Sequence, residues 1–222
     1  MKYRSVFDII GPVMIGPSSS HTAGAARIGR VARVLFGRAP ERIDITFFGS
    51  FAKTHKGHGT DIAIVGGVLG FDTSDKRIVD SLEIARRSGV SVVFHIDEEE
   101  EEITHPNMAR IKLQDKEESL EITGISIGGG KIEITEINGF TVKLSGNSPA
   151  LLVLHKDRFG MIASVSNVLT RWQMNIAAME VARKSKGSEA LMVIETDQDL
   201  PEDAVREIEA IPHVLKASLL SL

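Results

Sequence analysis

The pattern that most restricts the fold of this chain lies toward its C-terminus. Six segments follow one another there in the order strand, helix, strand, strand, helix, strand: Leu151–His155, Gly160–Arg171, Met174–Lys184, Glu189–Glu195, Pro201–Ile211 and Val214–Leu220. Val165, Val168 and Leu169 recur at helical spacing, and Lys186-Gly187 supplies a hairpin turn. This order predicts a βαββαβ domain of the ferredoxin-like type.

The residues before this pattern are numerous enough to form a second domain. The chain has 222 residues, more than one typical domain of about 100 to 200 residues. Its composition changes at Ser145–Pro149, where SGNSP ends an alternating segment and precedes a new apolar run. We therefore expect two domains, residues 1–147 and 148–222.

The first domain is expected to mix helices and strands, so that the whole chain is α+β. Ala23–Phe36 has apolar residues at three- and four-residue spacings and predicts an amphipathic helix. Ala109–Leu144 alternates apolar and polar residues between glycine turns, which is typical of several antiparallel strands. The intervening segments are predicted as a strand, a buried apolar segment, a helix and a strand: Ile43–Phe48, Thr60–Gly70, Asp75–Ser88 and Val90–Ile96. The acidic run Glu98–Glu102 is predicted to be a solvated loop.

Charge and composition exclude several classes of function. The chain carries 26 basic and 30 acidic residues, a net charge of -4, which argues against a nucleic-acid groove. It has no cysteine, so it cannot supply thiolate ligands, and no metal site is expected in this chain. The longest apolar run, Ile62–Phe71, is shorter than the roughly 18 residues of a membrane span. The N-terminus has no secretory pattern, and a cytoplasmic protein without a membrane partner is expected.

A serine-rich segment precedes the first predicted helix. Gly16 and Pro17 lead into Ser18, Ser19, Ser20, His21 and Thr22. Hydroxyls and free backbone N–H groups at a helix start can hold a carboxylate or phosphate. The alternative is that one of these residues only caps the helix. Three serines and a histidine exceed what a cap needs, so the segment is a candidate anion site.

A histidine-containing segment follows the first predicted strand. Lys53–Asp61 reads KTHKGHGTD and is predicted to be a loop. The glycines would allow a ligand to approach His58, and histidine is the usual proton-transfer group near neutral pH. His55 and His58 could instead bind a metal, but no third ligand is evident. A surface loop histidine without a role is the remaining alternative.

The sequence contains two further polar clusters. His105-Pro106-Asn107 indicates no more than a turn when taken alone. In the second domain, the segment from His155 to Gly160 lies between a strand and a helix, and Asn175 opens the next strand. These groups could face a small ligand near a helix N-terminus, although ordinary loop polarity explains them equally well.

Taken together and in order, these motifs resemble a known family. Over almost its whole length, the chain resembles the beta subunits of bacterial iron-sulfur-dependent L-serine dehydratases, also called L-serine ammonia-lyases. The motifs that carry this resemblance are GPSSSHTAGAARIGR, KGHGTD, HPN, HKDRFGMIASVSNVL and NIAAMEVAR. The resemblance implies a first domain similar to the allosteric substrate-binding domain of phosphoglycerate dehydrogenase, followed by an ACT domain. It also implies deamination of L-serine to pyruvate and ammonia at a 4Fe-4S cluster that a partner alpha subunit ligates.

The same resemblance implies roles for individual residues. His58 would remove the α proton of L-serine, and Thr60 would help to orient it. The remaining residues of the substrate pocket would be Ser18, Ser19, Ser20, His21, Thr22, His105 and Asn107. His155, Asp157 and Asn175 would contact a regulatory amino acid, and Asp157 replaces the asparagine usual at its position. The chain would be inactive alone and would form a homodimer through its ACT domains.

Two other classes of function remain open. A non-catalytic amino-acid sensor would explain the ACT pattern but has no need of the PSSSHT and KGHGTD segments. A histidine-based metalloenzyme complete in one chain would need a ligand triad that the spacing does not supply.

Overall fold

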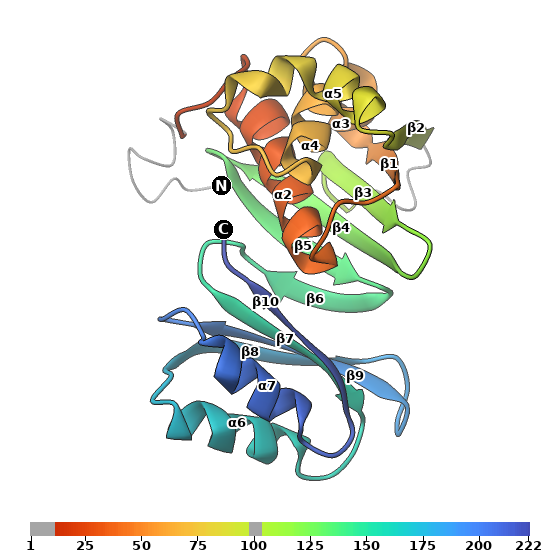
Figure 1. Ribbon diagram of the computed structural model, residues 1–222. Helices are drawn as coiled ribbons and strands as arrows, with labels where there is room; N and C mark the ends of the chain where they lie inside the picture. The colour runs from red at the N-terminus through yellow and green to blue at the C-terminus, as the bar shows by residue number, and fades with distance from the viewer. Residues whose placement is uncertain (1–11, 98–103) are drawn as a thin grey trace. The chain divides into compact units, whose positions relative to one another are not determined.

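The computed structural model describes residues 12–97 and 104–222. The chain divides into two compact units, Met1–Asn138 and Gly139–Leu222, each with its own strands and helices (Figure 1). The division falls in the turn after strand β5 (Lys131–Ile137), while the domain boundary expected after residue 147 stays a prediction. The predicted acidic loop Glu98–Glu102 lies outside the described residues.

The first sheet has the strand order β2-β1-β3-β4-β5-β6. Strand β1 pairs with β2 in parallel, whereas the pairs β1–β3, β3–β4 and β4–β5 are antiparallel. The strands are β1 (Arg42–Phe48), β2 (Ser91–Asp97), β3 (Asn107–Gln114), β4 (Ser119–Gly128), β5 (Lys131–Ile137) and β6 (Phe140–Leu144). The helical segments are η1 (Ser19–Ala23), α2 (Gly24–Phe36), α3 (Gly49–Thr54), α4 (Thr60–Val68), η2 (Lys76–Asp80) and α5 (Ser81–Arg87). The antiparallel strands predicted in Ala109–Leu144 are confirmed.

Helix α2 packs on β4 and against α4, where the two helix backbones approach unusually closely. A Cβ atom on Gly67 would lie 1.9 Å from the carbonyl oxygen of Ala26, and one on Gly29 would lie 2.1 Å from that of Ile64. Since real Cβ atoms do not come this close to backbone oxygens, glycine is required at both positions. The helix predicted at Ala23–Phe36 is confirmed within one residue.

Two sequence predictions in the first unit need correction. The segment Asp75–Ser88 is not one helix, because a 3₁₀ turn, η2, precedes α5, and the Asp75 side chain accepts a hydrogen bond from the Arg77 N–H at its start. The KTHKGHGTD segment is not a single loop, because its first two residues end α3 and Thr60 begins α4. Periodicity alone did not reveal α3, which has only six residues.

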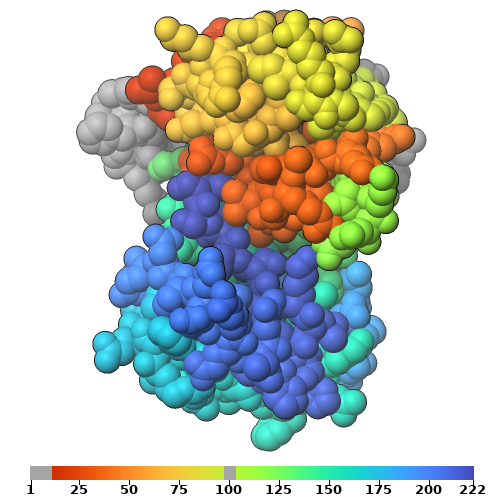
Figure 2. Space-filling view, in the orientation of Figure 1, coloured from red at the N-terminus to blue at the C-terminus, as the bar shows by residue number. Residues whose placement is uncertain are grey.

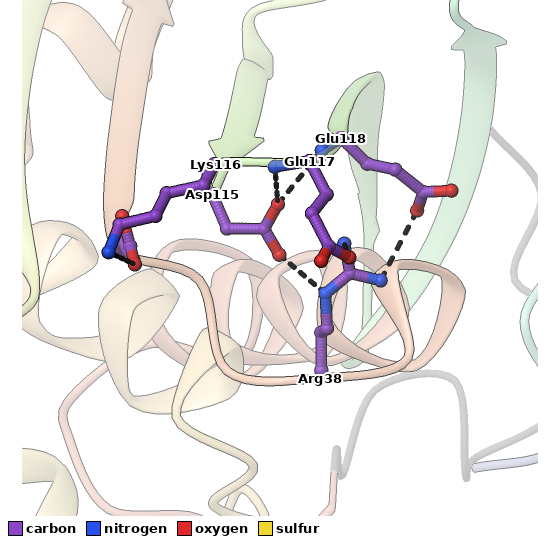
Figure 3. A network of polar contacts seen from close by, with 6 residues as sticks. Arg38, Asp115, Lys116, Glu117 and Glu118 are labelled. Atoms are coloured by element: carbon purple, nitrogen blue, oxygen red, sulfur yellow. Dashed lines mark hydrogen bonds and ion pairs between the residues drawn. The ribbon is translucent and has the colours of Figure 1, made fainter.

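A polar cluster fixes the turn between β3 and β4 (Figure 3). Arg38 donates hydrogen bonds to Asp115 and Glu118, and Asp115 accepts the N–H groups of Glu117 and Glu118, each at 2.8 Å. The hydrogen bond from Arg38 holds the pKa of Asp115 well below its usual range. The cluster thereby anchors the segment after α2 to this turn of the sheet.

The second unit has the strand order β10-β7-β9-β8, all antiparallel. Its elements are β7 (Ala150–Lys156), α6 (Met161–Arg171), β8 (Ile176–Arg183), β9 (Glu189–Thr196), α7 (Glu202–Glu209) and β10 (Val214–Leu220). Helices α6 and α7 cover one face of this sheet (Figure 1), and Leu151, Met192 and Ile208 lie in the core between them. The predicted βαββαβ order is confirmed.

In Figure 2 the η2–α5 segment, coloured yellow, forms part of the outer surface of the first unit, where Val79 is exposed. In the two described stretches of the chain, no helix has both the length and the apolar composition needed to cross a membrane.

Candidate functional site

The serine-rich segment is itself helical. Ser18 caps the turn η1, which runs directly into α2, and its Oγ accepts the N–H of His21 at 3.1 Å. The N–H groups of Thr22 and Ala23 donate to the carbonyl of Ser18. The prediction of several free N–H groups before α2 is therefore wrong for these two amides, because the helix starts earlier than the sequence indicated.

Side chains of this segment form a chain of hydrogen bonds that ends on α3. Ser18 Oγ lies 3.3 Å from Ser20 Oγ, and Ser20 Oγ lies 3.0 Å from His21 Nδ1. On the other side of the ring, His21 Nε2 lies 2.9 Å from Ser50 Oγ. Ser50 was not among the predicted site residues. Its position directly after a strand and a glycine was the available signal.

The turn that carries Ser50 is fixed by backbone contacts. Gly49 has a φ of +54°, and a Cβ there would lie 2.7 Å from the Pro106 carbonyl oxygen. That oxygen accepts the N–H of Ser50 at 2.6 Å and of Phe51 at 3.4 Å, so it satisfies the free N–H groups at the start of α3. The HPN segment thereby becomes part of the same site as Ser50.

His58 lies against the serine-rich segment. The rings of His21 and His58 meet edge to face with centroids 4.8 Å apart, and Thr22 Oγ1 donates to the carbonyl of His58 at 3.0 Å. Burial, and secondarily the neighbouring His58, lowers the pKa of His21 below its usual value. His21 is therefore neutral at pH 7.

Several buried polar atoms near these residues have no partner among the described residues. They include His58 Nδ1, the hydroxyl of Thr60 and the hydroxyl of Ser126. Ser126 lies on β4 against α2, where a Cβ on Gly24 would be 2.1 Å from its Oγ. Buried polar groups in folded proteins are normally hydrogen-bonded, so unpaired atoms at His58 and Thr60 mark a place where a ligand or water completes the site.

A cavity of about 440 Å³ opens beside Ser50. Its lining residues are Gly49, Ser50, Lys53, Thr54, Thr104, His105 and Pro106. His105 Nδ1 accepts the N–H of Asn107 at 3.1 Å, and burial lowers the pKa of His105. The neutral His105 ring must then carry its proton on Nε2. The Asn107 side chain donates to the carbonyl of Ser126 at 3.4 Å.

The two histidines of the KTHKGHGTD segment have different surroundings. His55 stacks on Phe47 with ring centroids 5.2 Å apart, and its Nδ1 lies 3.0 Å from the carbonyl of Ala52. Residues 12–97 and 104–222 contain no group of three or more metal-binding side chains. These contacts give His55 a packing role.

The candidate regulatory residues lie in the second unit. His155 is buried, with Nδ1 2.7 Å from the carbonyl of Lys156 and Nε2 without a partner in the described part of the chain. Asp157 accepts the N–H of Gly187 at 2.9 Å. The amide of Asn175 donates to Asp197. All three side chains thus have a hydrogen-bond partner within the unit, and His155 Nε2 is the atom left without one among the described residues.

Comparisons with known proteins give consistent matches. A family model described as "Serine dehydratase beta chain" matches residues 5–136, and one described as "ACT domain" matches residues 150–213. The chain is 58% identical over 221 residues to "Probable L-serine dehydratase, beta chain" of Bacillus subtilis (strain 168), with 100% of each chain covered. It is 37% identical over 219 residues to "L-serine dehydratase, beta chain" of Peptoniphilus asaccharolyticus, with 98% of each covered. It is also 26% identical over 198 residues to "D-3-phosphoglycerate dehydrogenase" of Bacillus subtilis (strain 168), which covers 89% of this chain and 37% of that protein.

Proposed function

The chain belongs to the serine dehydratase beta chain family, and from this premise we propose that it supplies the substrate-binding and proton-transfer half of a site that deaminates L-serine. The observation that carries the proposal is the meeting of three motifs that are far apart in sequence. His21 of PSSSHT contacts the ring of His58 in KGHGTD. His21 also bonds Ser50, whose backbone N–H donates to the carbonyl of Pro106 in HPN.

The proposed reaction is the loss of water from L-serine to aminoacrylate, followed by tautomerisation and hydrolysis to pyruvate and ammonia. His58 takes the α proton, because histidine is suited to proton transfer near neutral pH and its Nδ1 is buried without a described partner. Thr60, whose hydroxyl is also buried and has no partner in the described part of the chain, helps to orient His58. The serine-rich segment, with His105 and Asn107, forms the pocket in which the carboxylate and amino group bind.

The 4Fe-4S cluster that this proposal requires does not fit the donor set of this chain. Such clusters are held by cysteine thiolates, and the chain has no cysteine. We therefore assign the cluster to a partner alpha subunit, where an open iron would act as a Lewis acid on the departing hydroxyl. The active site would then lie between the two chains, and the beta chain alone would be inactive.

Reconstitution with an alpha chain tests the proposal. The isolated chain should form no pyruvate from L-serine, and the anaerobically reconstituted complex should do so. His58→Ala should lower kcat by about 100-fold or more, the usual loss for a general base. His95→Ala is the matched control, because His95 is half exposed on β2 near Asp44. Unchanged activity of the His58→Ala complex would remove that histidine from catalysis.

We further propose that the ACT domain binds an amino acid at His155, Asp157 and Asn175. The buried, unpaired Nε2 of His155 is the observation that favours a ligand there. Calorimetric titration of the chain with L-serine should show binding that Asn175→Ala abolishes. If binding depends on Asn175 but reconstituted activity with L-serine is absent, the chain is a non-catalytic amino-acid sensor instead.

A further inference from the structure

The lining of the cavity beside Ser50 is mostly apolar, and the charged or ring side chains among its described lining residues, Lys53 and His105, are hydrogen-bond donors. The ammonium of Lys53 and the Nε2–H of neutral His105 are available there, and no Asp or Glu is among the lining residues that the structure describes. Two other hydroxyls are already used, since Thr54 donates to the carbonyl of Ser50 and Thr104 donates to the sulfur of Met108. This set of donors suits a carboxylate.

The serines of the PSSSHT segment are not among the lining residues of this cavity. Ser18 and Ser20 contact each other and His21, and Thr22 contacts the carbonyl of His58. The contact that connects the segment to the cavity is therefore the bond between His21 Nε2 and Ser50 Oγ. How Ser50 acts on a ligand depends on the direction in which this bond runs.

The directions of these hydrogen bonds follow from the first of them, at the backbone N–H of His21. The His21 N–H donates to Ser18 Oγ. Ser18 O–H can then donate to Ser20 Oγ, Ser20 O–H to His21 Nδ1, and His21 Nε2–H to Ser50 Oγ. This leaves Ser50 O–H free to donate into the cavity. In the opposite direction, the described residues would offer Ser18 O–H no acceptor except the His21 ring at 3.5 Å, whose Nδ1 would then carry a proton.

We propose that Ser50 donates a hydrogen bond to the substrate carboxylate, and that the serines of the PSSSHT segment act through His21 to orient it. This inference rests on the proposed function for the identity of the ligand, an α-amino acid. Hydrogen bonds that all run in one direction polarise one another, so the chain also strengthens the final donor. Ser50 is the substrate-contacting residue, and Ser18, Ser20 and His21 are positioning residues.

The first test is the tautomer of His21 in the full chain, read by ¹⁵N NMR of labelled histidine. Wild type should carry the ring proton on Nε2. Ser50→Ala should shift the tautomer population, Ser50→Thr should restore it, and Ser74→Ala, a change at an exposed serine, should leave it unchanged. A proton on Nδ1 of His21 in the wild type, or identical spectra for Ser50→Ala and wild type, would overturn the proposed direction of the hydrogen bonds from Ser18 to Ser50.

The second test is kinetic and uses the reconstituted complex. A carboxylate contact present in both ground and transition states affects mainly KM. Ser50→Ala should raise the KM for L-serine, and the Ki of the unreactive analogue L-alanine, by about 10- to 100-fold, as expected for a hydrogen bond to a charged group. Ser50→Thr should recover most of this loss. Unchanged KM and Ki would overturn the carboxylate contact.

The two tests separate the inference from the function on which it rests. If the wild-type complex does not convert L-serine, the proposed function fails, while the tautomer measurement still decides the hydrogen-bond chain. If L-serine is converted but Ser50→Ala behaves as wild type, the function stands and the role of Ser50 is wrong.

Discussion

At the scale of single residues, His21 is the centre of the site. It touches His58 edge to face, bonds Ser50 through one nitrogen and Ser20 through the other, and packs against Phe51. When one of two imidazoles this close carries a positive charge, protonation of the other is disfavoured. If His58 takes a proton from the substrate, as we propose, His21 would stay neutral and keep its hydrogen bonds.

The lowered pKa of His21 predicts how stability depends on pH. Below about pH 6.5, the ordinary value, the unfolded chain binds a proton at this site more readily than the folded chain does. The contribution of His21 to stability should therefore be full above that pH and should fall as the pH is lowered toward its folded-state pKa. Urea midpoints measured from pH 5 to 8 should show a smaller acid-side decline in His21→Gln than in His95→Gln. Equal slopes in both variants would contradict this assignment.

At the scale of elements, the contact between α2 and α4 sets the position of the site. Gly29 and Gly67 allow the two helices to touch backbone to backbone. Helix α2 extends from η1, which carries His21, and α4 begins at Thr60, just after His58. A change in helix separation would therefore move the two histidines apart.

Neighbouring glycines of α4 provide a matched test. Gly67→Ala should destabilise the first unit by about 1–3 kcal/mol, because its Cβ would clash with the backbone of Ala26. Gly66→Ala should cost less, because the nearest atom to its Cβ would be a side-chain atom, Ile78 Cγ1 at 3.0 Å, and not backbone. Unfolding followed by far-UV circular dichroism should show the lower stability of the first unit, while fluorescence of Trp172, the single tryptophan, reports the second unit. Equal losses in the two variants would argue against the close approach.

At the scale of the whole molecule, the second sheet has an edge suited to self-association. β8 is one of the two edge strands of this sheet, and Val181 on it is exposed. Ile162 on α6 and Phe159 before it are also exposed apolar side chains of the same unit. Unpaired strand edges are templates for pairing with another chain, which supports the expected homodimer through the ACT domains.

The two edges of the sheet can be tested against each other. Sedimentation velocity should show a dimer for the wild type and a monomer for Val181→Lys, because a charge on β8 would oppose pairing. The same change at Leu215, exposed on the opposite edge strand β10, should leave the dimer intact. A monomeric wild type, or a dimer lost only in Leu215→Lys, would contradict pairing through β8.

The sequence by itself determined the elements whose signal is local. The βαββαβ order, the helix α2 and the antiparallel strands β3 to β6 follow from apolar periodicity and turn residues, which depend on neighbours within a few positions. The motifs also indicated the family, because their order and residue types are specific in combination. The His58 and PSSSHT segments were selected for their chemistry alone.

The tertiary structure decided which of these residues meet. Ser50 carries no motif, and it enters the site because the Gly49 turn and the Pro106 carbonyl place its hydroxyl against His21. The short helix α3 and the early start of the helix at Ser19 depend on caps and contacts that periodicity does not encode. Hydrogen bonds between residues far apart in sequence are set by the packing of the helices on the sheet, and so the chain from Ser18 to Ser50 could be seen only in the folded molecule.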